Sequence, residues 1–394
     1  MVTTALPPLL TSRSAPPVAA RRLLTGYYAG LGLVMAVWGS RMPAVQEAAQ
    51  LSPGRLAVVL LSAATGMVAG LQAGGRLVHR YGAARLLAAP AIGLGWSLAA
   101  LGWSSTLSSL VAAALLFGAM HGVFDVASNT AAVRCQTAYQ RPIMSGLHAA
   151  YSIGGLTGAV VAALTAHAPH DAVFTGAGTL AVLGALVAIP LTPAVARLDR
   201  GAAVGAAAAA GPAAISGQRS RIWLLGAVAA GCLLGEGAAA DWAAVHLYGM
   251  DSPAGVGATA YALYSAAMAV GRLAGDRLTA RYDAAVLVRG GATLAAVGLG
   301  AGLVVGTVPA ALLGWAALGL GLSIVVPSVF TAAGDGGPRA VATVAAVGYL
   351  GMLAGPAAIG ALASVSSLPI ALALPVLLAG AVACASHRAL GPAR

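Results

Sequence analysis

The sequence contains no lysine, and all 21 of its basic residues are arginine. A phosphate-binding loop of the Gly-x-x-x-x-Gly-Lys type requires a lysine, so energy from nucleotide hydrolysis at such a loop is excluded. Charged residues make up only 8% of the 394 residues, whereas a soluble domain has about 25%. The three cysteines, Cys135, Cys232 and Cys384, lie in separate segments without metal-type spacing. We therefore expect no bound metal and no other cofactor.

Hydrophobic residues make up 59% of the chain and occur in long runs separated by short loops that carry arginine. Because the net charge of +11 is spread over these loops, it is typical of a membrane protein and does not indicate nucleic-acid binding. A helix needs about 20 residues to span a hydrocarbon core of about 30 Å, whereas membrane strands are shorter and alternate in polarity. The sequence predicts twelve membrane helices, at 23–42, 55–78, 85–103, 107–132, 142–166, 171–191, 221–247, 255–279, 285–306, 309–331, 339–363 and 368–389.

One stretch of the first half recurs in the second half. Residues 70–86 and 271–287 are identical at 10 of 17 positions when they are aligned with a shift of 201. A repeat of about half the chain length indicates duplicated halves of parallel topology. We therefore predict an all-α integral membrane protein of two pseudo-symmetric six-helix bundles. Its parts are a tail at 1–22, bundles at 23–191 and 221–390, and a linker at 192–220.

The arginines are distributed unequally between the two ends of the predicted helices. Nineteen fall on the side that holds both termini and the linker, whereas only Arg41 and Arg55 fall on the other side. Positive charge is enriched in the cytoplasmic loops of membrane proteins. The sequence therefore predicts a multi-pass protein of the plasma membrane, such as a bacterial inner membrane, with both termini in the cytoplasm.

The repeated stretch carries a loop motif in each copy. The first copy resembles the loop between helices 2 and 3 of the major facilitator superfamily, whose pattern is Gly-x-x-x-Asp-Arg-x-Gly-Arg-Arg. His79 stands where that family has Asp, and alanines replace its two final arginines, so the charge relay assigned to the Asp is not carried over. The motif residues of the two copies are Gly75, His79, Arg80, Gly82 and Arg85, and Gly275, Asp276, Arg277 and Arg281.

Within that superfamily, four stretches resemble the fucose permease-like branch, including its uncharacterised bacterial inner-membrane members. They are 38–43, 125–129 together with 141–148, 236–242, and 271–277. The resemblance implies a secondary transporter, not an enzyme, that moves a small molecule by alternating access, is coupled to protons and works as a monomer in the bilayer. It favours uptake of a sugar-like solute. The alternatives are efflux of a drug or secondary metabolite by proton antiport and, in another class, a polytopic membrane enzyme.

Asp125 lies deep in the predicted fourth helix, nine residues or about 13 Å from Arg134. The spacing of His121, Asp125 and Asn129 places all three on one helix face. A charge at that depth is costly unless it is paired or hydrated. The resemblance implies that Asp125 couples transport to protons, because it matches a helix 4 carboxylate of the fucose permease; the Asp that this family has in helix 1 is absent. The alternative is a structural pairing of Asp125 with His121 or His148.

Glu236 is the second deep carboxylate, about 22 Å beyond Arg221 along the predicted seventh helix. It is a candidate for a second coupling or substrate group, and the alternative is a hydrogen bond to a neighbouring helix. The shift of 201 also places Arg41 and Asp241 at nearly equivalent outer ends of helices 1 and 7. We predict that this pair closes an outer gate when the cavity faces the cytoplasm. The alternative places Arg41 among lipid or water at the interface.

Polar and aromatic residues near these positions are candidates for the substrate cavity. Aromatic rings can stack on a sugar or an aromatic solute, although Trp and Tyr near helix ends also serve as interfacial anchors. The predicted cavity residues are Asn129, His148, Tyr151, Trp38 and Trp242.

Overall fold

The computed structural model describes residues 17–165, 167–208, 215–250 and 254–391. In these ranges the chain is helical and contains no strand, as the long apolar runs predict. The first bundle contains α1 (Val18–Ala48), α2 (Pro53–Tyr81), α3 (Arg85–Trp103), α4 (Leu107–Tyr139), α5 (Met144–Leu164) and α6 (His170–Ala188). Its principal helix pairs are α1 with α5, α2 with α4, and α3 with α6.

The second bundle repeats this arrangement. It contains α8 (Ile215–Tyr248), α9 (Ala254–Thr279), α10 (Ala284–Val305), α11 (Val308–Leu322), α12 (Val325–Gly334), α13 (Gly337–Val365), α14 (Leu368–Ala371) and α15 (Ala373–Leu390). The principal pairs are α8 with α13, α9 with α11, and α10 with α15. These are the pairs of the first bundle after the shift of 201 residues, so the packing has the symmetry that the repeat predicts.

Two spans of the second bundle are interrupted. α11 and α12 form one span, which breaks at Ser323 and Ile324. Pro327 explains the break, because its ring nitrogen has no hydrogen to donate to the Ser323 carbonyl. The last span is also interrupted: it consists of α14 and α15, with Leu372 between them.

Eleven of the described helical stretches are long and apolar enough to cross a membrane. α9 is not among them, and its C-terminal third carries Arg272, Asp276 and Arg277. It nevertheless packs on α11 as α2 packs on α4. We therefore count α9 as the twelfth span, which gives the predicted number.

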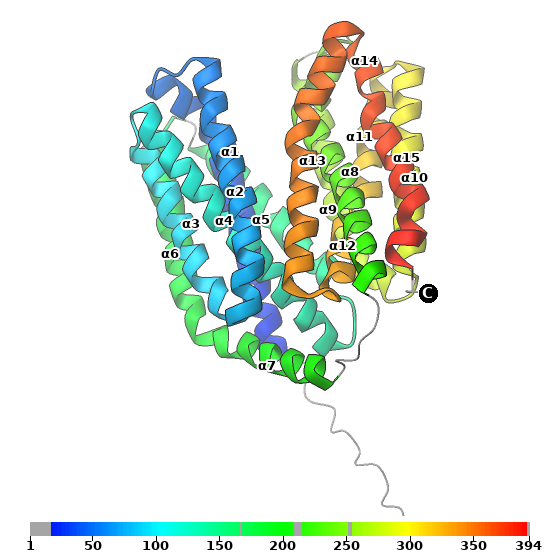
Figure 1. The fold of residues 1–394 in the computed structure, drawn as a ribbon. Coiled ribbons are helices and arrows are strands. Elements are labelled where there is room, and N and C mark those ends of the chain that lie inside the picture. The colour runs from blue at the N-terminus through cyan, green and yellow to red at the C-terminus, as the bar shows by residue number, and fades with distance from the viewer. Residues whose placement is uncertain (1–16, 166, 209–214, 251–253, 392–394) are drawn as a thin grey trace, which may run out of the picture.

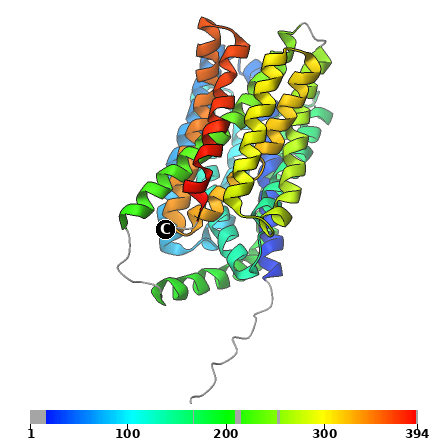
Figure 2. The same cartoon turned by 90° about the vertical axis from the view of Figure 1, so that its right-hand side faces the viewer.

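The linker contains a helix that its Ala/Gly-rich composition did not lead us to predict. α7 (Thr192–Ala208) follows α6 through a short 3-10 turn, η1 (Ile189–Leu191). Alanine has the highest intrinsic helix propensity, so an Ala-rich segment forms a helix once one end is anchored. α7 lies across one end of the molecule, below the bundles in Figures 1 and 2.

The two bundles lie side by side and diverge toward one end (Figure 1). They meet at the end that holds α7, the last turn of α2 with Arg80, and the loops with Arg141 and Arg281, which we call the arginine-rich end. The surface along which they meet, which we call the seam, pairs α2 with α13 and α5 with α9. The structure is therefore closed at the arginine-rich end and splayed at the opposite end.

Two motif glycines allow this close packing at the seam. A Cβ atom added to Gly75 of α2 would lie 2.7 Å from the Cβ of Ala342 in α13. One added to Gly275 of α9 would lie 2.5 Å from the Oγ of Ser145 in α5. Real Cβ atoms are not found so near such neighbours, so each copy of the repeat supplies a glycine that lets the halves touch.

Candidate functional site

Asp125 reaches across the seam from α4. Its side chain is only 5% exposed, and its Oδ1 accepts a hydrogen bond from the Tyr349 hydroxyl of α13 at 3.4 Å. Its Oδ2 is buried and, within the described residues, has no hydrogen-bond partner. A carboxylate oxygen buried without a donor is costly when the group is charged, whereas a bound proton removes that charge. The arrangement therefore suits a carboxyl group that binds and releases a proton.

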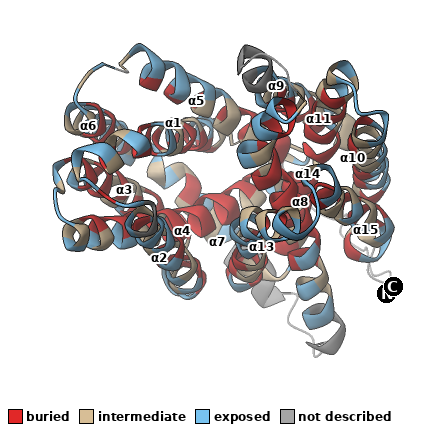
Figure 3. Ribbon diagram, turned by 90° about the horizontal axis from the view of Figure 1, so that it is seen from above, coloured by how far each residue is buried: buried red, intermediate tan, exposed pale blue. Residues whose placement is uncertain are grey.

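The face predicted for α4 is present and buried. His121, Asp125 and Asn129 lie in the run of buried residues 121–132 in the middle of α4, and Figure 3 colours buried residues red. The His121 ring packs edge-on against Tyr349, with centroids 6.2 Å apart. Among the described residues, no hydrogen bond joins Asp125 to His121 or His148. The structural pairing considered for Asp125 is therefore not the contact that this conformation contains.

Asn129 joins this group to α1. The Tyr28 hydroxyl donates to its Oδ1 at 2.8 Å, and its own Nδ2 donates to the backbone carbonyl of Asp125 at 2.9 Å. His148 of α5 packs edge-on to the Tyr28 ring at 5.3 Å and stacks on Phe330 of α12 at 6.1 Å. These contacts connect α1, α4, α5 and α12 around the predicted residues Asn129 and His148.

Glu236 forms an ion pair, which supplies the neighbouring-helix contact considered as its alternative role. Its Oε1 lies 3.3 Å from Nη2 of Arg272 in α9. Nη1 of the same arginine donates to Ser152 Oγ of α5 at 2.8 Å, across the seam. Arg272 is only 6% exposed and lies inside a helix. It lies in the part of α9 nearer the arginine-rich end, the side to which the sequence assigned it, but within the helix and not in a loop.

The candidate aromatic residues lie in different parts of the structure and do not form one cluster. Trp38 of α1 stacks on Phe117 of α4, within the first bundle, with centroids 4.9 Å apart. Trp242 of α8 lies in the second bundle, against Gly360 of α13. Its indole nitrogen is buried and has no partner among the described residues. Tyr151 of α5 is half-buried, one position from Ser152.

The ion pairs among the described residues do not include one between the predicted gate residues Arg41 and Asp241. Arg41 is buried and donates through Nη2 to the backbone carbonyl of Ala168, in the connection between α5 and α6 of its own bundle. Asp241 is exposed on α8. Both lie toward the splayed end, where the bundles diverge (Figure 1). The gate concerns the form in which that end is closed, so it stays a prediction.

The two loop motifs have different partners at the arginine-rich end. In the second copy, Asp276 accepts a hydrogen bond from the Gly146 N–H in the first turn of α5, at 3.0 Å. In the first copy, the corresponding carboxylate comes from α7. Asp199 pairs with Arg134 of α4 and accepts from the Ala84 N–H at 2.9 Å, next to Gly82 with its positive φ of 83°. His79 is exposed.

The contacts that four residues of the site make were not predicted: those of Tyr28, Tyr349, Arg272 and Asp199. Arg272 had a usable signal, because the shift of 201 carries it to Leu71, which is fully buried. A charged residue in place of a buried leucine indicates a partner within the protein. The tyrosines and Asp199 gave no such signal, because their partners are distant in the sequence.

Comparison with known proteins agrees with this architecture. The family model described as the Major Facilitator Superfamily matches residues 23–356. An uncharacterised MFS-type transporter from Yersinia pestis is 34% identical over 379 residues, covering 93% of this chain and 94% of that protein.

Solved structures of the same fold include two symporters. The fucose:proton symporter FucP of E. coli superposes with a TM-score of 0.69 at 14% identity, covering 95% of this chain and 99% of the other. The proton:xylose symporter XylE gives a TM-score of 0.71 at 13% identity, covering 96% and 97%. At these identities the likeness concerns the fold. Together with the family match and the twelve spans, it leads to one conclusion: the chain is a multi-pass membrane transporter that belongs to the major facilitator superfamily.

Proposed function

We propose that the protein takes up a sugar-like solute together with protons by alternating access. The observation that carries the proposal is the buried Asp125 carboxyl, with Tyr349 of the other bundle at Oδ1 and, in the described part of the chain, no donor at Oδ2. The solved neighbours that are named as proton symporters of fucose and xylose support this choice of solute and of coupling ion. The hydroxyl, amide and imidazole groups of Tyr28, Asn129 and His148 also fit a polar solute better than an apolar drug.

Asp125 acts as the proton carrier in this mechanism. A proton that enters from the splayed end binds Oδ2, to which none of the described residues donates, and removes the charge, so the halves can rock with a neutral group at the seam. The proton leaves when the arginine-rich end opens to water. His121, which packs against Tyr349, lies on the path of the proton. Glu236 remains charged beside Arg272 and contributes by holding that arginine, which contacts Ser152 of the first bundle.

The remaining parts of the proposal concern orientation and the outer end. The protein lies in the plasma membrane, and its arginine-rich end, with both termini and α7, faces the cytoplasm. One chain suffices for transport. The halves are the bundles at 23–191 and 221–390, joined by the linker at 192–220. Trp38, Tyr151 and Trp242 belong to the solute path, and Arg41 and Asp241 pair when the splayed end closes. The gate is tested by neutralising Arg41 and Asp241 singly and together. Additive effects of the two substitutions on transport would contradict the gate.

The test begins with a thermal-stability screen of purified protein against monosaccharides, starting with fucose and xylose. A solute that stabilises the protein is then followed in proteoliposomes with an imposed pH gradient. Asp125→Asn should abolish accumulation driven by the gradient, yet it should spare exchange of labelled solute, which needs no net proton movement. Accumulation in Asp125→Asn that equals the wild type would refute the coupling role.

A further inference from the structure

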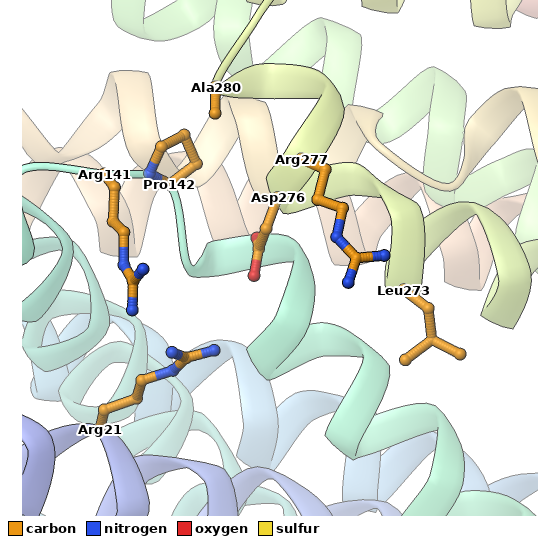
Figure 4. A pocket seen from close by; sticks show the side chains of 7 residues that line it. All are labelled: Arg21, Arg141, Pro142, Leu273, Asp276, Arg277 and Ala280. Atoms are coloured by element: carbon orange, nitrogen blue, oxygen red, sulfur yellow. The ribbon is translucent and has the colours of Figure 1, made fainter.

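A cavity of about 570 Å³ opens on the seam at the arginine-rich end. Three arginines contribute to its wall (Figure 4). Arg21 comes from the first turn of α1, Arg141 from the connection between α4 and α5, and Arg277 from α9. The first two belong to one bundle and the third to the other, so the cavity is shared by both halves.

The wall carries an excess of positive charge. Asp276 is the one carboxylate among the lining residues, and its Oδ1 accepts a hydrogen bond from the Gly146 N–H at 3.0 Å. In Figure 4 its carboxylate lies between Arg21 and Arg141 on one side and Arg277 on the other. The ion pairs that the structure contains among its described residues involve none of these three arginines. Three guanidinium groups against one carboxylate leave an excess of two positive charges.

A tyrosine holds two of these like charges near each other. The guanidinium carbon of Arg21 lies 5.6 Å from the centre of the Tyr139 ring, and that of Arg141 lies 5.0 Å from the same ring. A ring face attracts each cation without neutralising it. Two guanidinium groups positioned in this way repel each other, and an anion between them relieves that repulsion. Tyr139 therefore prepares the site for a negatively charged ligand.

We propose that this cavity binds a phosphate-type oxyanion, from an anionic lipid headgroup or from free phosphate, and that the bound anion bridges the two bundles. Arginine pairs with phosphate oxygens through two parallel hydrogen bonds, and basic pockets between membrane helices receive anionic headgroups. Arg21 and Arg141 hold the anion from the first bundle, and Arg277 holds it from the second.

The bridge makes the anion sensitive to conformation. All three arginines surround one ligand only while the arginine-rich end is closed, because Arg277 moves with the second bundle. A ligand that binds one conformation better than another shifts the population toward it. The anion therefore favours the form that is closed at the arginine-rich end. This effect is independent of the transported solute and of Asp125.

The first arm of the test uses phosphatidylglycerol, titrated into detergent-purified protein while bound copies are counted by native mass spectrometry. Each arginine near an anionic headgroup contributes about fivefold to affinity, so Arg141→Gln/Arg277→Gln should weaken the tightest site about 25-fold. Arg289→Gln is the matched control, since Arg289 is an exposed arginine of α10 outside the cavity. The affinity of this variant for phosphatidylglycerol should differ from that of the wild type by less than twofold.

The second arm titrates inorganic phosphate into the same protein without lipid and follows thermal stability. If phosphate binds with the same arginine dependence and the lipid does not bind, the site takes a soluble anion. If the lipid binds with this dependence and phosphate does not, the site takes a lipid headgroup. If the double variant does not stay monodisperse, Arg277→Gln alone decides, with an expected fivefold loss. The proposal is overturned if the arginine variants bind both probes as tightly as the wild type, or if Arg289→Gln loses as much affinity as they do.

Spin labels at the splayed ends of α1 and α8 test the bridge itself. Whichever of phosphatidylglycerol and phosphate binds more tightly is added to the labelled protein. It should increase the fraction of wild-type molecules in which these two ends are apart, and it should not do so in Arg277→Gln. Binding of the anion without any change in that population would overturn the bridge.

Discussion

Tyr27 and Tyr28 are neighbours on α1 with opposite hydrogen-bond environments. The Tyr28 hydroxyl donates to Asn129 at 2.8 Å, whereas the Tyr27 hydroxyl is buried and has no partner within the described residues. Tyr28→Phe should lower the free energy of unfolding by about 1 kcal/mol, because Asn129 loses its donor. Tyr27→Phe, the matched control, should leave that free energy unchanged or raise it. Denaturation in mixed micelles measures both, and equal losses would contradict the assignment.

Arg272 and Glu236 are expected to depend on each other. Arg272→Gln leaves the half-buried Glu236 carboxylate without its cation, which should lower the free energy of unfolding by about 2 kcal/mol. The double variant with Glu236→Gln removes the unpaired charge and should recover part of this loss. Unfolding measurements on both single variants and the double variant should give a coupling of at least about 1 kcal/mol. Additive losses would show that the pair contributes nothing.

Part of this residue-level site could be predicted from the sequence. The spacing of His121, Asp125 and Asn129 was sufficient to place them on one face of α4, because helix periodicity is local. The donor to Asp125 could not be found in this way, since Tyr349 is 224 positions away along the chain. Which tyrosine faces a given carboxylate depends on how the bundles dock, and no local pattern encodes that.

At the scale of single elements, α7 packs on the first bundle through the buried Val195 and makes polar contacts with it through the Asp199 carboxylate. Asp199 contacts both Arg134 of α4 and the Ala84 N–H between α2 and α3. Asp199→Ala should therefore increase backbone hydrogen exchange over residues 192–201 about tenfold, which corresponds to about 1.4 kcal/mol of lost protection. Mass spectrometry of exchanged peptides measures the effect.

Asp335→Ala is the control for this exchange experiment. Asp335 also pairs with an arginine, but at 3.8 Å and with its side chain 73% exposed, so its loss should leave α7 unchanged. Equal exchange of α7 in the wild type and in Asp199→Ala would mean that the helix is held by other contacts.

The elements themselves were largely predictable, because length and hydropathy specify a membrane span. The exceptions have physical causes. α7 was missed because an Ala/Gly tract fits a flexible linker as well as a helix, and its anchor, Asp199, acts only through tertiary contacts. The interruption between α11 and α12 lies next to Pro327, which has no backbone N–H to donate.

At the scale of the whole molecule, closure of the arginine-rich end depends on how near α2 comes to α13. Gly75→Ala would place a methyl group 2.7 Å from the Ala342 side chain, so the helices must separate. Overpacking of this kind costs about 1 kcal/mol or more, which should reduce the closed population about fivefold. Distances between spin labels on α1 and α8 at the splayed end would report the shift.

Gly290→Ala is the control for this change, because a Cβ on Gly290 of α10 meets no atom within 4 Å. It should leave the distance distribution as in the wild type. A Gly75→Ala protein with the same distribution would show that the glycine contact does not limit closure.

The central claim is that solute and proton cross together and that Asp125 carries the proton. The most direct measurement is the external pH of weakly buffered proteoliposomes when a stabilising monosaccharide is added. We expect an alkaline shift outside wild-type vesicles, as protons enter with the solute, and no shift with Asp125→Asn, although that variant still binds and exchanges the solute. An alkaline shift of equal size with Asp125→Asn would show that another group carries the proton.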